Sequence, residues 1–195
     1  MNAHPLRLRV QSATAETPVI RGLVFAPEGG TFPSWGAGSH IRISLPGGGD
    51  RPYSLMALPD LPKGCWALGV LREQPSTGGS SFMHALKIGD IVRASAPINN
   101  FGLHTGNTPA ILLAGGIGST PILSMAAELQ ARGTPYRLPM QGARRRVSRF
   151  CCSSARLARM PSLSTMTAMS RGWISRPRST APPARSTSIS ADRQG

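Results

Sequence analysis

Three short stretches of the sequence combine residue types that could hold a charged, planar molecule. The first is RPYSL, in which Arg51 and Tyr53 stand two positions apart and Ser54 follows at once. In a strand, residues i and i+2 share one face, so the cation and the ring would lie together. Arginine pairs with phosphate, an aromatic ring stacks on a planar group, and a hydroxyl contacts a heteroatom. Taken alone, this stretch is explained more simply by a solvated strand end.

The second stretch is TGGSS, at residues 77–81, directly ahead of a predicted helix. Exposed backbone N–H groups and the positive end of a helix dipole are typical of a phosphate-binding turn. An ordinary glycine-rich loop before a capped helix accounts for these residues equally well.

The third stretch is AGGIGSTP, at residues 114–121. Glycine turns after a strand let the backbone approach a pyrophosphate closely. The acidic residue that such sites carry about 20 positions later, at the end of a second strand, is missing here. As a lone dinucleotide motif, the match is weak.

The elements that must position these stretches are mostly short strands separated by Gly and Pro. Alternating or apolar runs predict six of them: LRLRV, VIRGLVFAP, SHIRISLP, RPYSLMAL, CWALGVLRE and DIVRASAPI. Such a series is typical of a small antiparallel barrel or sandwich. Pro52 removes a ladder donor, which places its strand at an edge or a bend.

Two helices interrupt or follow this series. SSFMHALKIG predicts a short helix with Ser80 or Ser81 as its N-cap and Gly89 as its end. TPAILLAGGIGSTPILSMAAELQARG predicts an apolar strand, a glycine turn and a helix capped by Thr120 and stopped by Gly133. This β-turn-α is the opening of a parallel-sheet domain, and no further unit follows in this reading frame.

The charge of the chain is concentrated in its last part. The net charge is +14, yet residues 1–136 contain 10 Lys and Arg against 7 Asp and Glu, while residues 137–195 contain 12 Arg and one acid. Leu, Ile, Val and Phe make up only 7 of those last 59 residues. A chain this basic and this poor in apolar residues cannot bury a core, so we expect a disordered tail.

Cysteine and histidine usage indicates no metal site. Cys65, Cys151 and Cys152 form no disulfide framework, and Cys65 beside Trp66 is expected to be a buried small hydrophobe. The four histidines have no ligand spacing. The N-terminus resembles no signal peptide, and the longest apolar run, AILLAGGIG, is too short to cross a bilayer. We therefore expect a cytoplasmic protein without a membrane partner.

The three motifs occur in a fixed order, with GSHIRISLP ahead of them. Over residues 5–138 the sequence resembles the ferredoxin-reductase superfamily, and within it the FMN-containing reductases of phthalate dioxygenase and vanillate demethylase systems. The resemblance implies a β plus α/β architecture. A Greek-key antiparallel flavin-binding barrel would span residues 1–104, and the start of a nicotinamide-binding domain would span 107–136. Residues 137–195 would then be the basic tail.

The resemblance also implies roles for individual residues. Arg51 would pair with the flavin phosphate, and Tyr53 and Ser54 would be the catalytic pair, stacking on the ring and lying near its N5 atom. The phosphate would be closed in by Gly78, Gly79 and Ser80. Both flavin and nicotinamide would be bordered by the glycine turn, at Gly115, Gly116, Gly118 and Thr120. The short TGGSS turn suits a terminal phosphate and so favours FMN over FAD, which remains the alternative.

The sequence departs from this family after about residue 138. A Cys-Gly-Pro motif and the cysteine spacing of a [2Fe-2S] domain are both missing. The family strand Leu-His-Tyr-Ala-Gly-Arg, with one base deleted from its codons, reads as Leu-Pro-Met-Gln-Gly-Ala, the residues found at 138–143. The same shifted frame permits Asp-Gly-Asp-Glu from residues 166–175 and Cys-Gly-Pro from 186–195. We interpret residues 137–195 as an out-of-frame nicotinamide domain.

The expected function is that of a flavin-dependent oxidoreductase, the reductase component of an aromatic-ring oxygenase or O-demethylase. The intact form would pass electrons from NAD(P)H through FMN to a [2Fe-2S] centre and then to a terminal oxygenase. The chain as it stands is expected to be inactive in this reaction. Two alternatives stay open: a flavin-binding remnant without turnover, and a nucleic-acid-binding protein acting through its Arg-rich tail, for which no sequence-specific contact is expected.

Overall fold

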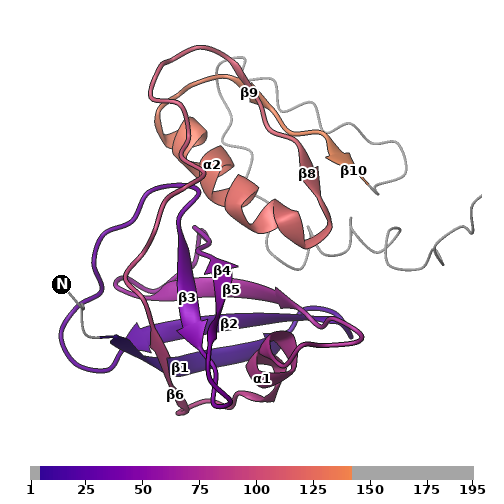
Figure 1. Cartoon of the computed structure of the whole chain (residues 1–195). Coiled ribbons are helices and arrows are strands. Elements are labelled where there is room, and N and C mark those ends of the chain that lie inside the picture. Colours follow the sequence, from indigo (N-terminus) through magenta and orange to yellow (C-terminus); the bar gives the residue numbers. More distant parts are fainter. Residues whose placement is uncertain (1–4, 142–195) are drawn as a thin grey trace, which may run out of the picture.

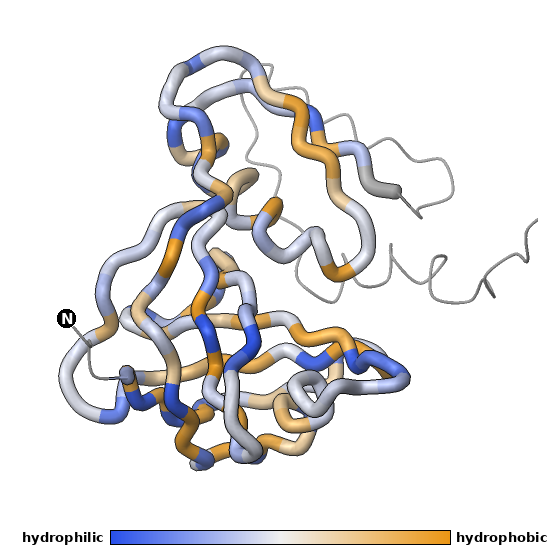
Figure 2. The backbone as a smooth tube through the Cα atoms, viewed as in Figure 1, coloured by the Kyte–Doolittle hydropathy of each residue, from blue (hydrophilic) through white to orange (hydrophobic). Residues whose placement is uncertain are grey.

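The computed structural model describes residues 5–141, which form an antiparallel barrel and a smaller parallel unit (Figure 1). All six strands expected in the first hundred residues are present. They are β1 (Leu6–Ala15), β2 (Ile20–Pro27), β3 (His40–Ser44), β4 (Asp50–Ser54), β5 (Trp66–Leu71) and β6 (Ile91–Ala94). Buried and less buried positions alternate along β3, β6 and the first half of β1, whereas β2 and β5 are mostly apolar. Figure 2 shows hydrophobic and hydrophilic residues interspersed through the barrel.

The strand order is β4-β3-β6-β1-β2-β5, with every neighbouring pair antiparallel. The last strand returns beside the first, which is a Greek-key arrangement and confirms the predicted fold class. The two terminal strands, β4 and β5, approach each other, and a bridge from Met56 to Ala67 joins the chain beyond β4 to β5. Pro52 lies on β4, a terminal strand, as its missing N–H predicts.

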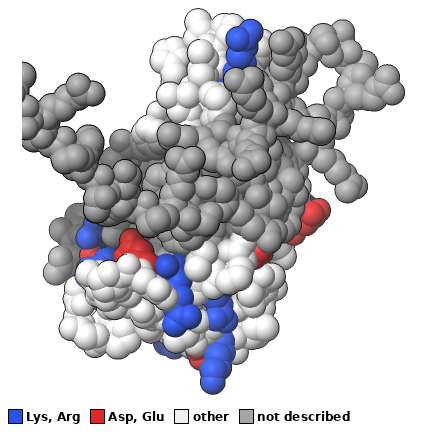
Figure 3. Space-filling model, turned by 90° about the vertical axis from the view of Figure 1, so that its right-hand side faces the viewer, with Lys and Arg blue, Asp and Glu red and all other residues white. Residues whose placement is uncertain are grey.

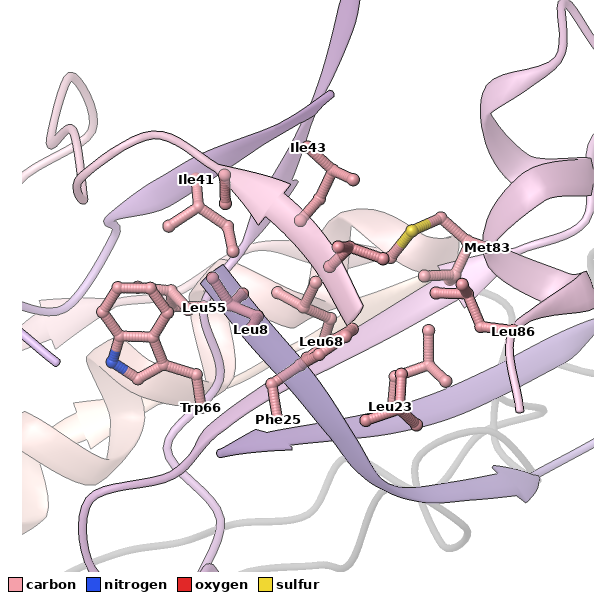
Figure 4. Packing of buried hydrophobic residues seen from close by; sticks show 14 residues of the cluster. Leu8, Leu23, Phe25, Ile41, Ile43, Leu55, Trp66, Leu68, Met83 and Leu86 are labelled. Carbon is pink, nitrogen blue, oxygen red and sulfur yellow. The ribbon is translucent and has the colours of Figure 1, made fainter. Parts of the chain in front are cut away.

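The barrel is held together by apolar side chains from its inner face (Figure 4). Fully buried examples from separate strands are Leu8, Phe25, Ile41 and Leu68. The ring of Trp66 stacks on Phe32 with centroids 4.0 Å apart. These contacts make the barrel a rigid support for the residues at its open seam.

The first helix, α1 (Gly79–Ala85), sends Met83 into this core. The predicted serine cap is wrong: the N-cap is Gly78, with φ 101°, and no side chain caps the helix. The Ser80 hydroxyl instead accepts the N–H of Glu73 at 3.1 Å. At the other end, Arg21 donates to the carbonyl oxygens of His84 and Leu86 and so ties α1 to β2.

The second unit is a β-α-β arrangement. It contains β7 (Ala110–Ile111), β8 (Ala114–Gly115), the 3-10 turn η1 (Gly116–Gly118), α2 (Ser119–Ala131), β9 (Tyr136–Arg137) and β10 (Met140–Gln141). β7 pairs in parallel with β9, and β8 with β10. The sheet therefore continues past residue 136, where we expected the domain to stop. The ladder bonds of β9 and β10 use backbone atoms only, so they depend little on which side chains these residues carry.

The helix α2 starts two residues earlier than expected, at Ser119 rather than at Pro121. Thr120 is not its cap, because the helix begins at Ser119 and the Thr120 hydroxyl donates to the Ile117 carbonyl at 3.0 Å. Gly133, with φ 67°, ends the helix as predicted. Figure 1 shows α2 between the barrel and the parallel strands, and its apolar side chains pack on Leu112 and Ala114.

The surface of the barrel mixes both signs of charge (Figure 3). Arg9 pairs with Glu28 and Arg42 with Asp50, both on the exterior. Exposed pairs of this kind contribute little to stability. The predicted basic tail covers residues 137–195, and from residue 142 onward it lies outside the described residues.

Candidate functional site

A cavity of about 390 Å³ lies at the open seam between the terminal strands β4 and β5. Residues 51–54 and 69–71 line it from these strands. Thr77 contributes from the loop before α1, and Gly79 and Ser80 contribute from the first turn of that helix. The second unit contributes Ile117, Gly118, Thr120 and Pro121. The three stretches RPYSL, TGGSS and AGGIGSTP, whose residue types could bind a charged planar molecule, therefore meet at one place, although they are far apart in the sequence.

Arg51 supplies the positive charge of this cavity. It pairs in register with the buried Ile43 and so belongs to the inner face of the barrel, at its open end. Its guanidinium donates to the Asp50 carbonyl at 2.8 Å and, within residues 5–141, forms no ion pair with a carboxylate. A guanidinium with free donors beside a cavity can bind a phosphate or carboxylate.

Tyr53 stands beside Arg51 on the same face. Its ring is half-buried and packs against the barrel core. Burial raises the pKa of the phenol, the Glu73 carboxylate raises it further, and the Arg51 cation opposes both. Tyr53 is therefore a neutral phenol at pH 7, with a ring that can contact a planar group.

The loop before α1 is organised by Ser76. Its hydroxyl accepts the N–H of Gly78 at 3.1 Å and that of Ser81 at 3.4 Å, and it shares a hydrogen bond with Ser80 Oγ at 3.0 Å. In this part of the structure the N–H groups of Gly79 and Ser80 have no protein acceptor. Both belong to the first turn of α1, where N–H groups have no acceptor within the helix, so at the cavity they are free to donate to an anionic oxygen.

Gly79 is required for the loop to approach β4 closely. A Cβ atom there would lie 2.7 Å from Arg51 Cγ and 3.2 Å from the Tyr53 hydroxyl. A glycine at this position therefore allows the free N–H groups of α1 and the Arg51 guanidinium to lie beside the same part of the cavity.

The glycine turn of the second unit is only partly at the cavity. Gly118 and Thr120 line it, whereas Gly115 and Gly116 do not. Gly116 adopts φ 52°, so its glycine is needed for the shape of the turn. The structure thus brings together seven of the predicted residues, namely Arg51, Tyr53, Ser54, Gly79, Ser80, Gly118 and Thr120. Gly78 stands next to them as the helix cap.

Several residues at the cavity were not foreseen from the sequence. Val70 and Leu71 reach it because β5 is the other terminal strand, and Glu73 and Pro121 lie beside predicted residues. A serine two positions before a Gly-Gly turn is a local signal that could have identified Ser76. Strand order, in contrast, is set by the whole sheet.

Ser54 also borders a second recess, of about 360 Å³, on the outer face of β3 and β4. His40, Arg42 and Phe101 are among its lining residues. The Arg42 guanidinium lowers the pKa of the Asp50 carboxyl, mainly through their hydrogen bond. That pairing leaves little free charge in this recess.

Two sequence expectations concern cysteine and the membrane. Cys65 is half-buried rather than buried, because its thiol contacts the Gln11 side chain at 2.9 Å near the surface. Among the helices of residues 5–141, none is long and apolar enough to cross a membrane.

A Greek-key barrel, with a cavity at its seam that could hold an anionic group, is followed by a parallel β-α-β unit. No protein-family model matches the chain. It is 40% identical over 134 residues to the heme-dependent oxidative N-demethylase beta subunit of Ectopseudomonas mendocina, covering 68% of this chain and 43% of that one. It is 44% identical over 112 residues to the vanillate O-demethylase oxidoreductase of Pseudomonas sp. strain HR199, covering 57% and 35%.

Among solved structures, phthalate dioxygenase reductase superposes with a TM-score of 0.63 at 31% identity, covering 70% of this chain and 43% of that one. The chain thus spans less than half the length of these relatives. Residues 5–141 belong to the ferredoxin-reductase superfamily, whose members among these relatives are oxidoreductases.

Proposed function

We propose that residues 5–141 are the flavin-binding part of a reductase that passes electrons from NAD(P)H to an oxygenase or demethylase. The observation that carries this proposal is the single cavity in which RPYSL, TGGSS and the GGIGSTP turn converge. The names of the relatives, an N-demethylase subunit and an O-demethylase oxidoreductase, support the same reaction class.

Several features of the cavity support binding of FMN. Arg51 and the N–H groups of Gly79 and Ser80 would bind its phosphate, and the close approach of Gly79 to Arg51 leaves a place that a larger residue would fill. The Tyr53 ring would contact the planar ring system, with Ser54 near its N5 atom. We favour FMN over FAD because the groups that would bind phosphate lie in a short turn that opens directly into α1, which suits a terminal phosphate; binding of FAD is the alternative.

Bound flavin would supply hydride acceptance from NAD(P)H and release of single electrons. The residues of this chain would orient it: Arg51 and the loop fix one end, and Tyr53 fixes the plane. Gly118 and Thr120, on the opposite wall, would border the space through which a nicotinamide approaches. The neutral phenol of Tyr53 adds no charge beside the ring.

We further propose that this chain does not complete the electron transfer. We assign residues 110–141 to the first β-α-β unit of a nicotinamide domain, and we interpret the Arg-rich sequence that follows as out of frame. That segment, and with it the alternative of nucleic-acid binding by the tail, lies outside the described residues from 142 onward. Resequencing the gene across codons 136–143 tests the reading frame. A base that the present reading lacks would support a shifted frame, whereas an unchanged nucleotide sequence would contradict a sequencing error.

The proposed function is tested by titrating the full chain with FMN and with FAD, following quenching of flavin fluorescence. Saturable binding of FMN, tighter than that of FAD, is expected, and no NADH-dependent reduction of an added acceptor. Absence of flavin binding would refute the flavin site. Rapid NADH oxidation would show instead that the chain is a working reductase.

A further inference from the structure

The helix α2 contacts the barrel through a buried serine. Ser124 is only 2% exposed, and its hydroxyl donates to the Leu55 carbonyl at 2.9 Å and accepts the N–H of Ala57 at 3.0 Å. Both partners lie in the segment that directly follows Ser54. One side chain of the second unit therefore binds the end of the strand that carries the predicted flavin contacts.

The backbone of this segment explains why a hydroxyl is needed. The N–H groups of Leu55 and Met56 donate within the barrel, to Ser39 and Ala67. The Leu55 carbonyl and the Ala57 N–H face α2 and are satisfied there by a group that both donates and accepts. Leaving such buried groups unpaired is costly, so these two bonds constrain where α2 can lie.

The position of this contact relates it to the cavity. Ser54, one residue before Leu55, lines one wall, and Thr120, one helical turn before Ser124, lines the other. The hydrogen bonds of Ser124 therefore join the two walls just behind the cavity. They therefore constrain how far Ser54 can lie from Thr120 and Pro121.

Apolar contacts alone would not fix that separation. Met125, the next residue of α2, packs beside Gly38, where an added Cβ would lie 3.1 Å from Met125 Cε. Methionine is flexible and tolerates sliding of the surfaces that it joins. Hydrogen bonds depend steeply on distance and angle, so they do not tolerate such sliding.

We propose that Ser124 is a positioning residue that holds the walls of the cleft at the width in which the flavin ring is bound. This inference rests on the proposed flavin site. Without the two bonds, the cleft would populate wider arrangements. The apparent affinity for flavin would then fall in proportion to the fraction of molecules with the correct width.

The test compares Ser124→Ala with Ser95→Ala in the full chain. The Ser95 hydroxyl also makes two backbone hydrogen bonds, from the Arg42 N–H and to the Ala96 carbonyl, but on the side of β3 away from β4. Both variants lose the same groups, so a merely structural effect would appear in both. Thermal unfolding without flavin, FMN affinity and the visible circular dichroism of bound FMN are measured for each.

We expect both variants to unfold at a lower temperature, while only Ser124→Ala binds FMN about tenfold more weakly and alters its dichroism. Ser124→Cys, which keeps a weak donor and acceptor of similar size, should bind with intermediate affinity and serves if the alanine variant does not fold. Wild-type affinity and dichroism in the Ser124 variants, or equal changes in Ser95→Ala, would overturn the inference alone. Failure of the unaltered chain to bind FMN would overturn the proposed function as well.

Discussion

Replacing Gly79 by alanine should separate flavin binding from folding. The added Cβ would lie 2.7 Å from Arg51 Cγ, whereas carbon atoms in contact prefer about 3.5–4.0 Å. Arg51 Cγ is close to the backbone, so the clash cannot be relieved by a small movement at the end of the side chain. Rotation about χ1 of Arg51 relieves it and carries the guanidinium away from the cavity.

The expected magnitude follows from the contact that is lost. A hydrogen bond between a guanidinium and a phosphate contributes about 1.5–3 kcal/mol, so FMN affinity should fall roughly 10- to 100-fold. Folding should be little affected, because alanine is favoured over glycine in a helix by about 1 kcal/mol, which offsets a strained Arg51 rotamer. The melting temperature without flavin should therefore stay close to that of the unaltered chain.

The assay is a fluorescence titration with FMN, with Gly47→Ala as the matched control. A Cβ at Gly47 would meet nothing within 4 Å, and that turn is remote from the cavity. In an Arg51→Ala background, Gly79→Ala should add little, because the cation that it displaces is already gone. Unchanged FMN affinity in Gly79→Ala, or full additivity of the two substitutions, would refute this reasoning.

Three further predictions concern the loop, the phenol and the first helix. Ser76→Ala removes the acceptor of two loop N–H groups and should weaken FMN binding several-fold in the same titration, because the free N–H groups lose their fixed direction; equal affinity would contradict the role of Ser76. Burial and the Glu73 carboxylate raise the pKa of Tyr53 in the folded chain, so protonation of the phenol stabilises the folded state. This contribution to the free energy of unfolding is fully present below the pKa of an unfolded tyrosine, about 10, and is lost as pH rises through the raised pKa of the folded chain. Melting temperatures from pH 8 to 11 should accordingly fall less steeply for Tyr53→Phe than for the unaltered chain, and parallel curves would disprove the assignment. Arg21→Leu, which removes two hydrogen bonds to the end of α1, should lower the free energy of unfolding by about 2 kcal/mol in urea, and a change below a few tenths would contradict that role.

The strands of the barrel were predictable because the pattern of apolar residues within each strand reflects which of its side chains are buried. In SHIRISLP, for example, the apolar residues Ile41 and Ile43 are both fully buried, and Arg42 between them is not. The helices were located for similar reasons, but their caps were not. Ser80 is drawn to the Glu73 N–H and Thr120 to the Ile117 carbonyl, and these local geometries depend on glycine conformations that the sequence leaves open.

The cavity itself was predicted only in part. The three motifs were recognisable by residue type, but their meeting point depends on β4 and β5 being the two ends of the sheet. That order places Val70 and Leu71 opposite Tyr53. Likewise, nothing in LSMAA distinguishes Ser124 from a solvent-facing helix serine, because its partners lie 69 and 67 residues away in the sequence. Long-range contacts of this kind are properties of the folded chain.

The most direct test of the flavin site is a crystal structure of the full chain with FMN. It should place the phosphate within hydrogen-bonding distance of the Arg51 guanidinium and the N–H groups of Gly79 and Ser80, with the ring against Tyr53 and its N5 atom near Ser54. FMN bound with its phosphate elsewhere, or in the recess lined by His40 and Phe101, would contradict the account.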